Sequence, residues 1–192
     1  MGEAERSNSV TSIDESVLVA HAKSSREAFA PLYVLYFDRV FAYCFRRLGS
    51  HDDASDATSA IFARVLEALP QCRDNAFRSW LFAIAHNTLI DMYRSQRHHA
   101  PIDDIAGLAD RHPSPEEEAL TREGGRSVAA MLALLPADQA HVLELRLAGL
   151  TSREIGSILG KSPNAVDQAQ YRAVQRLRTL LAGTNSVVEG LL

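Results

Sequence analysis

The segment from Phe77 to Arg97 carries residue types that bind nucleic-acid bases. At helical spacing, its apolar residues fall on one face and its polar, aromatic and basic residues on the other. An aromatic ring that stacks on an unstacked base contributes about 1–3 kcal/mol, and amide and guanidinium groups contact base edges and phosphates. The residues expected on this outward face are Trp80, His86, Asn87, Asp91, Arg94 and Arg97. The sequence thus predicts a base-binding surface, with burial in a core as the open alternative for Trp80.

Residues 151–181 have the pattern of two helices joined by a tight turn. Thr151 and Glu154 match a capping box, Gly160 supplies the turn, and Ser162-Pro163 starts the second helix. This pattern indicates a helix-turn-helix, whose second helix enters a DNA major groove about 12 Å wide. Gly156 stands where the two helices must approach closely. A plain helical hairpin inside a bundle is the alternative.

Other kinds of chemistry lack support in the sequence. It holds no P-loop, GxSxG, HExxH or dinucleotide-binding fingerprint, and its helical carboxylates do not form a recognisable acid/base pair. His98 and His99 have no other ligand type nearby at metal-binding spacing. Cys44 and Cys72 make neither a disulfide framework nor a metal site. We therefore expect no enzyme, no catalytic residue, no metal, no cofactor and no small-molecule substrate.

The composition indicates a folded protein that binds DNA weakly when alone. Hydrophobic residues make up 46% of the 192 residues, and 20 Lys and Arg against 24 Asp and Glu give a net charge of −4. DNA-binding domains are usually basic, so DNA contact here is local or assisted by a larger partner. No apolar run approaches the roughly 20 residues that span a bilayer, and residues 1–12 are too polar for a signal peptide. We expect a soluble, cytoplasmic protein without membrane contact of its own.

Helical periodicity predicts an all-α protein of two small domains. It covers residues 26–48, 52–69 and 77–97, with a helix start after Ser50 and an end at Pro70. It resumes over residues 116–135, 136–148, 151–159 and from Pro163 to about Ala182, beyond which we expect fraying. Residues 98–115 contain three prolines and few large apolar residues, which is typical of a linker. The predicted domains are residues 10–97 and 116–183, joined by a flexible linker over residues 98–115.

The second predicted domain resembles region 4 of sigma factors. The residues that carry the resemblance are Leu135-Pro136, Leu143-Glu-Leu-Arg-Leu, Gly149-Leu150-Thr151, Glu154-Ile155-Gly156, Leu159-Gly160-Lys161-Ser162, Ala165-Val166 and Arg172-Ala173 through Leu177-Arg178. The resemblance implies that the last helix docks on the minus-35 promoter element and that this domain also touches the polymerase flap. Taken by itself, it leaves open a helix-turn-helix activator of the response-regulator type.

The first predicted domain resembles region 2 of the same family. The matching residues are Phe29, Leu32, Tyr33, Tyr36, Val40, Tyr43, Arg47-Leu48-Gly49, Asp53-Ala54-Ser55-Asp56, Phe62, Phe77-Arg-Ser-Trp80-Leu81, Ile84-Ala85-His86-Asn87, Asp91, Arg94 and Arg97. A linker stands where larger sigma factors have a further domain, so the chain resembles the extracytoplasmic-function (ECF, group 4) sigma factors of the sigma-70 family. That resemblance implies binding to core RNA polymerase, promoter-specific initiation and control by an anti-sigma factor.

The resemblance also implies roles for residues of region 2. The connector 71–75 would line the pocket for a flipped minus-10 base, with Arg73 and Asn75 as preferred contacts beside the outward residues of 77–97. The clamp helices of the largest polymerase subunit would meet a mostly acidic surface, whose residues are Arg47, Asp52, Asp53, Asp56 and Ser59. The family often has Gln-Glu where Ser59-Ala60 stands. Alternatively, the aspartates only stabilise the start of their helix.

For the minus-35 element, the implied residues flank and begin the last two helices. They are Thr151, Ser152, Arg153, Ser162, Asn164, Asp167, Gln168, Tyr171, Arg172 and Arg176. The family often has Lys, Ser and Arg at the outward positions where this chain has Asp167, Gln168 and Ala169. Our hypothesis is that Asp167 and Gln168 face bases while the arginines hold the backbone; alternatively, Asp167 only favours the helix start. A stand-alone regulator that binds operator DNA as a dimer is the second functional interpretation.

Overall fold

A computed structural model describes residues 15–73, 76–99 and 128–189 of the chain, and of residues 96–99 and 182–189 it describes the backbone alone. The described residues form helices and turns without a β-strand. The chain divides into two compact units: Met1–Cys44 with Asp52–Ala100, and Phe45–His51 with Pro101–Leu192. The expected all-α architecture of two helical domains is therefore confirmed.

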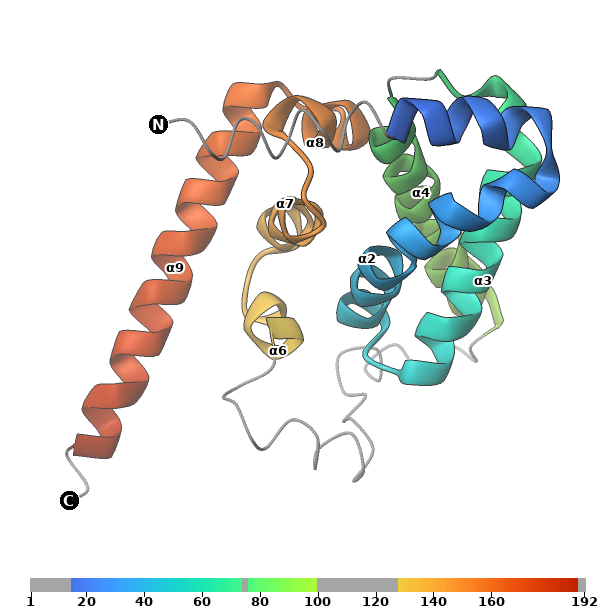
Figure 1. Ribbon diagram of the computed structural model, residues 1–192. Helices are drawn as coiled ribbons and strands as arrows, with labels where there is room; N and C mark the ends of the chain where they lie inside the picture. The colour runs from blue at the N-terminus through green and yellow to red at the C-terminus, as the bar shows by residue number, and fades with distance from the viewer. Residues whose placement is uncertain (1–14, 74–75, 100–127, 190–192) are drawn as a thin grey trace. The chain divides into compact units, whose positions relative to one another are not determined.

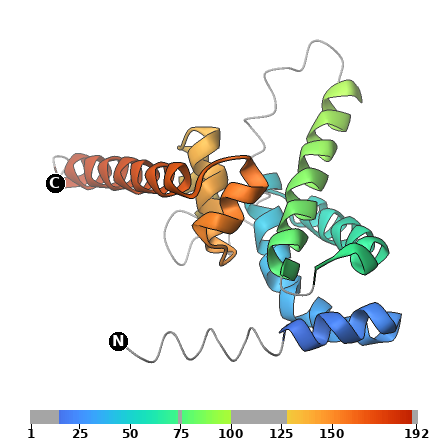
Figure 2. The same ribbon diagram turned by 90° about the horizontal axis from the view of Figure 1, so that it is seen from above.

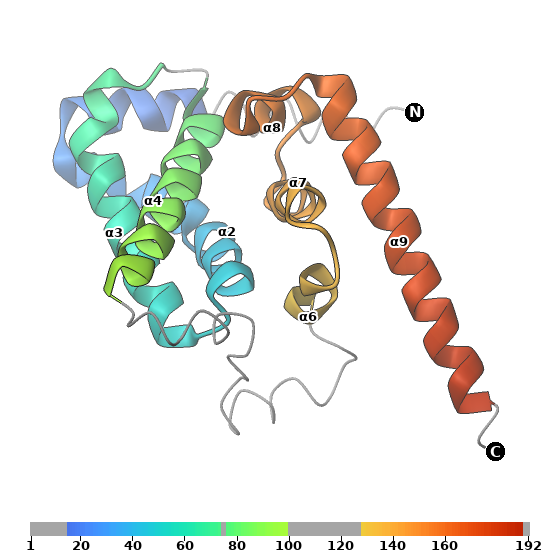
Figure 3. The same ribbon diagram turned by 180° about the vertical axis from the view of Figure 1, so that it is seen from behind.

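Three long helices form the first unit. They are α2 (Ala30–Leu48), α3 (His51–Ala68) and α4 (Phe77–His99), preceded by a helix over residues 15–24 and the short η1 (Arg26–Phe29), with η2 (Leu69–Gln71) after α3 (Figure 1). Aromatic rings join these helices. Tyr33 of α2 lies 4.7 Å from Phe62 of α3, and Tyr36 of α2 lies 5.4 Å from Phe77 of α4, measured between ring centroids. Viewed from behind, α4 crosses in front of α2 and α3 (Figure 3).

Helix α2 is the most apolar of these helices. By length and composition, Arg26–Leu48 could cross a membrane, so the expectation that no segment is so apolar was wrong. The core helix of a soluble bundle passes the same test. Here Leu32, Tyr36, Val40 and Tyr43 are buried at spacings of three or four residues, which is the pattern of a helix that packs one face into a core.

The helix boundaries differ from the sequence prediction at three places. Pro70 does end α3, but through the 3-10 turn η2. Helix α4 continues through His99, two residues beyond its expected end at Arg97. Helix α9 continues to Glu189, so the expected fraying after Ala182 was wrong. Residues 100–115, and residues 116–127 of the predicted helix 116–135, lie outside the described part.

The second unit contains α6 (Val128–Ala133), α7 (Ala137–Leu147), α8 (Ser152–Leu159) and α9 (Pro163–Glu189). Helix α9 packs against α7 and α8, and α6 packs against α7. One cluster of their apolar residues contains Leu132, Leu135, Ala140 and Ala173, with Leu143 and Leu177 packed against it. In the view from above, the C-terminal part of α9 extends away from α6, α7 and α8 (Figure 2). Leu180 and Leu181, further along α9, are both exposed.

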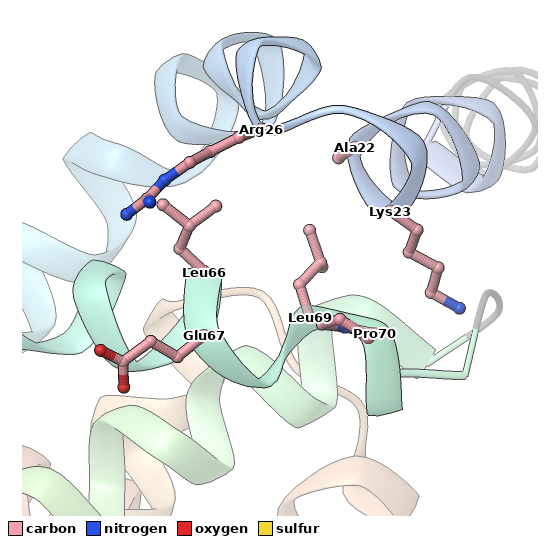
Figure 4. Close-up of a pocket in the computed structure, with 7 residues that line it drawn as sticks. All are labelled: Ala22, Lys23, Arg26, Leu66, Glu67, Leu69 and Pro70. Atoms are coloured by element: carbon pink, nitrogen blue, oxygen red, sulfur yellow. The ribbon is translucent and has the colours of Figure 1, made fainter.

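A shallow hollow of about 230 Å³ lies between residues 22–26 and the end of α3. Figure 4 shows Leu66 pointing toward Arg26 and Leu69 pointing toward the helix that carries Ala22, with Lys23 and Glu67 at opposite ends of the hollow. Its lining mixes the buried Ala22 and Leu69 with charged side chains. It holds no cluster of His, Cys, Asp or Glu that could bind a metal, and neither does any other place in the described residues.

Candidate nucleic-acid interface

The start of α8 is fixed by a complete capping box. The Thr151 hydroxyl accepts from the Glu154 N–H at 3.3 Å, and the Glu154 carboxylate accepts from the Thr151 N–H at 2.7 Å. These bonds satisfy two of the N–H groups that a helix start leaves without a partner. The capping box predicted from the sequence is confirmed. Thr151 is exposed, but its hydroxyl also donates to Glu154 at 2.8 Å.

Two glycines allow α8 and α9 to meet at a tight turn. Gly160 ends α8 with a φ of 65°, a left-handed conformation that glycine adopts without a steric penalty. A Cβ atom added to Gly156 would lie 2.5 Å from the carbonyl oxygen of Lys161, which is too close for any side chain. The predicted roles of both glycines are confirmed, and the helix-turn-helix is formed by α8, this turn and α9.

Helix α9 presents a polar stripe opposite its buried face. Val166, Ala169 and Ala173 are buried, so the expectation that Ala169 points outward was wrong. Residues at spacings of three or four on the opposite side are exposed: Asn164, Gln168, Tyr171 and Gln175. Arg172 and Arg176, four and eight residues after Gln168, are also exposed and flank this stripe. Gln175 was missed in the sequence analysis, although the helical period placed it on this face.

Asp167 lies on the flank of α9, beside that stripe. Its Oδ1 atom accepts a hydrogen bond from the Ser152 hydroxyl at the start of α8 and lies 3.4 Å from a guanidinium nitrogen of Arg146 in α7. Its side chain is 60% exposed. Ser152 and Asp167, both expected at the minus-35 surface, are thus brought together. Arg146 was not recognised from the sequence as a functional residue.

Other residues of the predicted minus-35 set lie at the two helix starts. Arg153 is exposed on the first turn of α8. Ser162 precedes α9, and its hydroxyl accepts from the Ala165 N–H at 3.2 Å. Ser162 therefore caps α9 and leaves the exposed Asn164 in the first turn.

Helix α4 carries part of the predicted base-binding face. Asn87, Asp91 and Arg94 are exposed at spacings of four and three residues, so they share one side of the helix. Trp80, on the same side, is half-buried, with its ring centroid 6.0 Å from that of Phe77. The structure thus combines the two alternatives for Trp80: one part packs on the core and the other is exposed.

His86 differs from the expectation. Its side chain is 7% exposed, and its Nδ1 atom lies 3.2 Å from the buried Tyr43 hydroxyl. His86 follows the buried Phe82 by four residues and precedes the buried Leu89 by three, so the helical period places it on the core face. The prediction that His86 lies on the outward face was wrong.

Asp91 contacts a neighbouring helix. Its carboxylate lies 3.5 Å from a guanidinium nitrogen of Arg64 in α3, and the same nitrogen donates to the Thr88 hydroxyl at 3.0 Å. Both charged side chains are more than half exposed, so the ion pair itself stabilises the fold by only about 0–1 kcal/mol. Its effect is to bring a positive charge next to Asp91 on this face.

The connector before α4 is described only in part. Arg73 is exposed, and its carbonyl accepts from the Ala76 N–H at 3.0 Å. Asn75 and the side chain of Arg97 lie outside the described residues. A pocket for a flipped base at this connector therefore stays a prediction.

The predicted polymerase surface is exposed on one side of α3. Asp52, Asp56 and Ser59 are exposed at spacings of four and three residues, whereas Asp53 is half-buried. Arg47 lies in the last turn of α2.

Both units match known families in the expected order. The Sigma-70 region 2 model matches residues 32–99, and the Sigma-70, region 4 model matches residues 125–177. The chain is 36% identical over 151 residues to the ECF RNA polymerase sigma factor ShbA of Streptomyces griseus, which covers 72% of this chain and 79% of that relative. The chain belongs to the ECF RNA polymerase sigma factors.

Further relatives of this ECF sigma factor agree. It is 30% identical over 148 residues to the ECF RNA polymerase sigma factor SigD of Mycobacterium tuberculosis, covering 72% of this chain and 70% of that one. Its fold is similar to that of CnrH in complex with the cytosolic domain of CnrY, with a TM-score of 0.67, 26% identity, and coverage of 88% and 97%. A solved complex of the sigma factor RpoE with the anti-sigma factor NepR from Bartonella quintana is similar in fold, with a TM-score of 0.64 and 20% identity, covering 80% and 96%.

Family membership decides between the functional interpretations. A sigma factor is a transcription initiation factor, not an enzyme, and the stand-alone regulator is no longer favoured. The two family matches fall on the two helical domains expected from the sequence.

Proposed function

We propose that this sigma factor binds core RNA polymerase and selects promoters through two separate surfaces. The exposed stripe of α9 contacts the minus-35 element, and the exposed side of α4 contacts the minus-10 element. One observation carries the proposal furthest: a capped helix-turn-helix presents Asn164, Gln168, Tyr171 and Gln175 opposite the buried face of α9.

The residue types on α9 suit a major groove. An Asn or Gln amide can pair with the N6 and N7 atoms of adenine, which suits Asn164 and Gln168 on the outward stripe. Arg172 and Arg176 flank the stripe, where guanidinium groups can hold phosphates without reading sequence. We propose that Arg153, on the first turn of α8, also contacts the DNA backbone.

The exposed side of α4 suits single-stranded DNA. The accessible part of Trp80 offers a ring on which a base can stack, and Asn87 offers an amide for a base edge. Arg94 lies on the same side and can neutralise a phosphate. Asp91 does not repel the strand strongly, because Arg64 lies 3.5 Å away. We propose that Arg73, Asn75 and Arg97, predicted from the sequence, also contact the minus-10 element.

The acidity of the chain is compatible with this function if the polymerase supplies most of the affinity. A net charge of −4 gives little general attraction to phosphates. We propose that Asp52, Asp56 and Ser59 on α3 contact basic groups on the clamp helices of the largest polymerase subunit, with Asp53 beside them. Complementary charge at such a contact favours orientation and association rate more than affinity.

An anti-sigma factor is proposed as a further partner. The similar RpoE was solved in complex with the anti-sigma factor NepR. A partner that covers the surfaces for polymerase or DNA would hold this chain inactive. The protein is expected to act in the cytoplasm, where the polymerase works.

The proposal is tested by adding the purified chain to core RNA polymerase with a library of promoter fragments and sequencing the RNA 5′ ends. The expected result is a set of new start sites that share one upstream and one downstream element. Absence of both core binding and new start sites would contradict the proposal. Tight sequence-specific binding to duplex DNA by the chain alone would instead favour a stand-alone regulator.

A further inference from the structure

Arg146 joins three helices through a single side chain. From the last turn of α7, its Nε atom donates to the Gln170 side-chain oxygen of α9 at 2.9 Å, and one Nη atom donates to the Leu150 carbonyl at 3.0 Å. Its other Nη atom donates to the Ser152 hydroxyl at 2.6 Å and lies 3.4 Å from the Asp167 carboxylate. A guanidinium is a rigid planar fork with five donors, so one arginine can serve acceptors on several elements.

Asp167 faces this arginine and not the outward stripe. Its Oδ1 atom accepts from the Ser152 hydroxyl and is also the atom nearest to Arg146. It comes from the side of α9 next to Gln170, one turn away, which Arg146 also contacts. Asn164 and Gln168 have no such contact with α7 or α8 among the interactions described for them.

Two separated contacts then hold α9 against α8. At the turn, the Lys161 N–H donates to the Gly156 carbonyl at 2.9 Å, where no side chain fits. At the opposite end of α8, Ser152 contacts Asp167, and Arg146 contacts both of them. Together with the packing of α9 against α7 and α8, these contacts at the two ends of α8 constrain the angle between the helices.

We propose that Arg146 and Asp167 are positioning residues for recognition of the minus-35 element, and that Asp167 contacts no base. Together with Ser152 they form a clamp that holds α9 at the angle at which Asn164, Gln168 and Arg172 meet the groove. This inference rests on the proposed function of α9. It assigns to Asp167 neither of the two roles considered from the sequence, base contact or stabilisation of the helix start.

The clamp also explains how an acidic residue is tolerated beside DNA. The Arg146 guanidinium places a positive charge 3.4 Å from the Asp167 carboxylate. The pair of Arg146 and Asp167 carries no net charge, so the pair as a whole does not repel the DNA phosphates. An unpaired carboxylate at the same place would repel them.

The test compares Arg146→Lys, Asp167→Asn and the double variant, each in the full chain. Lysine keeps the charge of Arg146 but not the planar fork, and asparagine keeps the shape of Asp167 but not its charge. Asp138→Asn is the matched control, because Asp138 is an exposed acidic residue in the first turn of α7, outside the clamp. Transcription with core polymerase is measured on promoters randomised in the minus-35 element, and on a pre-melted template that lacks this element.

The expected result is a several-fold loss of preference at all minus-35 positions together in both single variants. The double variant should lose no more preference than the more impaired of the two single variants, because the two residues act through one contact. Transcription from the pre-melted template and the behaviour of Asp138→Asn should match the unchanged protein. The inference is overturned if Asp167→Asn alters preference at one base pair while Arg146→Lys alters none, or if the two effects simply multiply.

A second measurement separates this inference from the proposed function. Amide hydrogen exchange of residues 150–156 in the free chain should accelerate in Arg146→Lys and Asp167→Asn but not in Asp138→Asn. Unchanged exchange in both variants contradicts the clamp even if the unchanged protein initiates transcription normally. Conversely, failure of the unchanged protein to initiate with core polymerase contradicts the proposed function, while accelerated exchange would still support the clamp.

Discussion

At the scale of single residues, exposure separates neighbours with different roles. His86 and Asn87 are adjacent in α4, yet His86 is buried against Tyr43 and Asn87 is exposed beside Asp91 and Arg94. The helical period indicates this difference, because His86 lies four residues after Phe82 and three before Leu89, on the core face of the helix. The polar side chain of His86 nevertheless favoured the prediction of an exposed position. Ala169 was expected outward from the family resemblance, although the period places it between the buried Val166 and Ala173.

The substitution His86→Ala should lower the free energy of unfolding of the first unit by about 1–3 kcal/mol, since it removes a buried hydrogen bond and buried volume. Urea denaturation of the full chain, followed by circular dichroism, measures the change. Asn87→Ala is the matched control and should stay within about 0.5 kcal/mol of the unchanged protein. Equal stability of the two variants would show that His86 is not part of the core.

At the scale of elements, most of the helix-turn-helix could be predicted from its sequence. The capping box at Thr151, the left-handed Gly160 and the close approach at Gly156 all depend on neighbouring residues or on one turn. The clamp could not be predicted in this way. It joins Arg146 to Asp167, 21 positions away, and only the packing of α7 against α9 brings the two together.

Gly156→Ala should destabilise the second unit by about 1–3 kcal/mol, because its methyl group would overlap the Lys161 carbonyl oxygen and the backbone there must shift. Thermal denaturation measures the effect. Ser157→Ala, at the next and exposed position of α8, is the control and should not lower the melting temperature. A Gly156→Ala protein as stable as the control would mean that the turn relaxes without strain.

Thr151→Ala removes the side chain that caps α8 while the helix residues stay the same. The loss should be about 1 kcal/mol, the usual contribution of an N-cap hydroxyl. Amide exchange at Glu154, whose N–H now donates to Thr151, should accelerate in parallel. A Thr151→Ser variant keeps the hydroxyl and should retain most of the stability; if it loses as much as Thr151→Ala, the cap is not the cause.

At the scale of the whole molecule, the order of the two domains was more predictable than the ends of the helices. The sequence predicted two helical domains, and the family matches fall on the same two parts of the chain. The helix ends were less predictable, because local patterns do not show how far packing or solvent tolerates another turn. Helix α9 continues to Glu189, although residues 183–186 contain no large apolar side chain.

The isolated chain should bind duplex promoter DNA weakly, because its net charge of −4 offers few counterion-releasing contacts. Fluorescence anisotropy at physiological salt, with and without core polymerase, measures this dependence. Tight binding is expected only in the presence of polymerase. A dissociation constant below about 10 nM for the chain alone, in the range of specific DNA-binding proteins, would contradict the dependence.

The central claim is that α9 and α4 read two different promoter elements. The most direct measurement sequences RNA 5′ ends made by core polymerase from promoters randomised in both elements. It compares the unchanged chain with Gln168→Ala in α9 and Asn87→Ala in α4. Gln168→Ala should relax preference only in the minus-35 element, and Asn87→Ala only in the minus-10 element. If either variant alters the other element instead, or if both leave the two preferences unchanged, the assignment of the two surfaces is wrong.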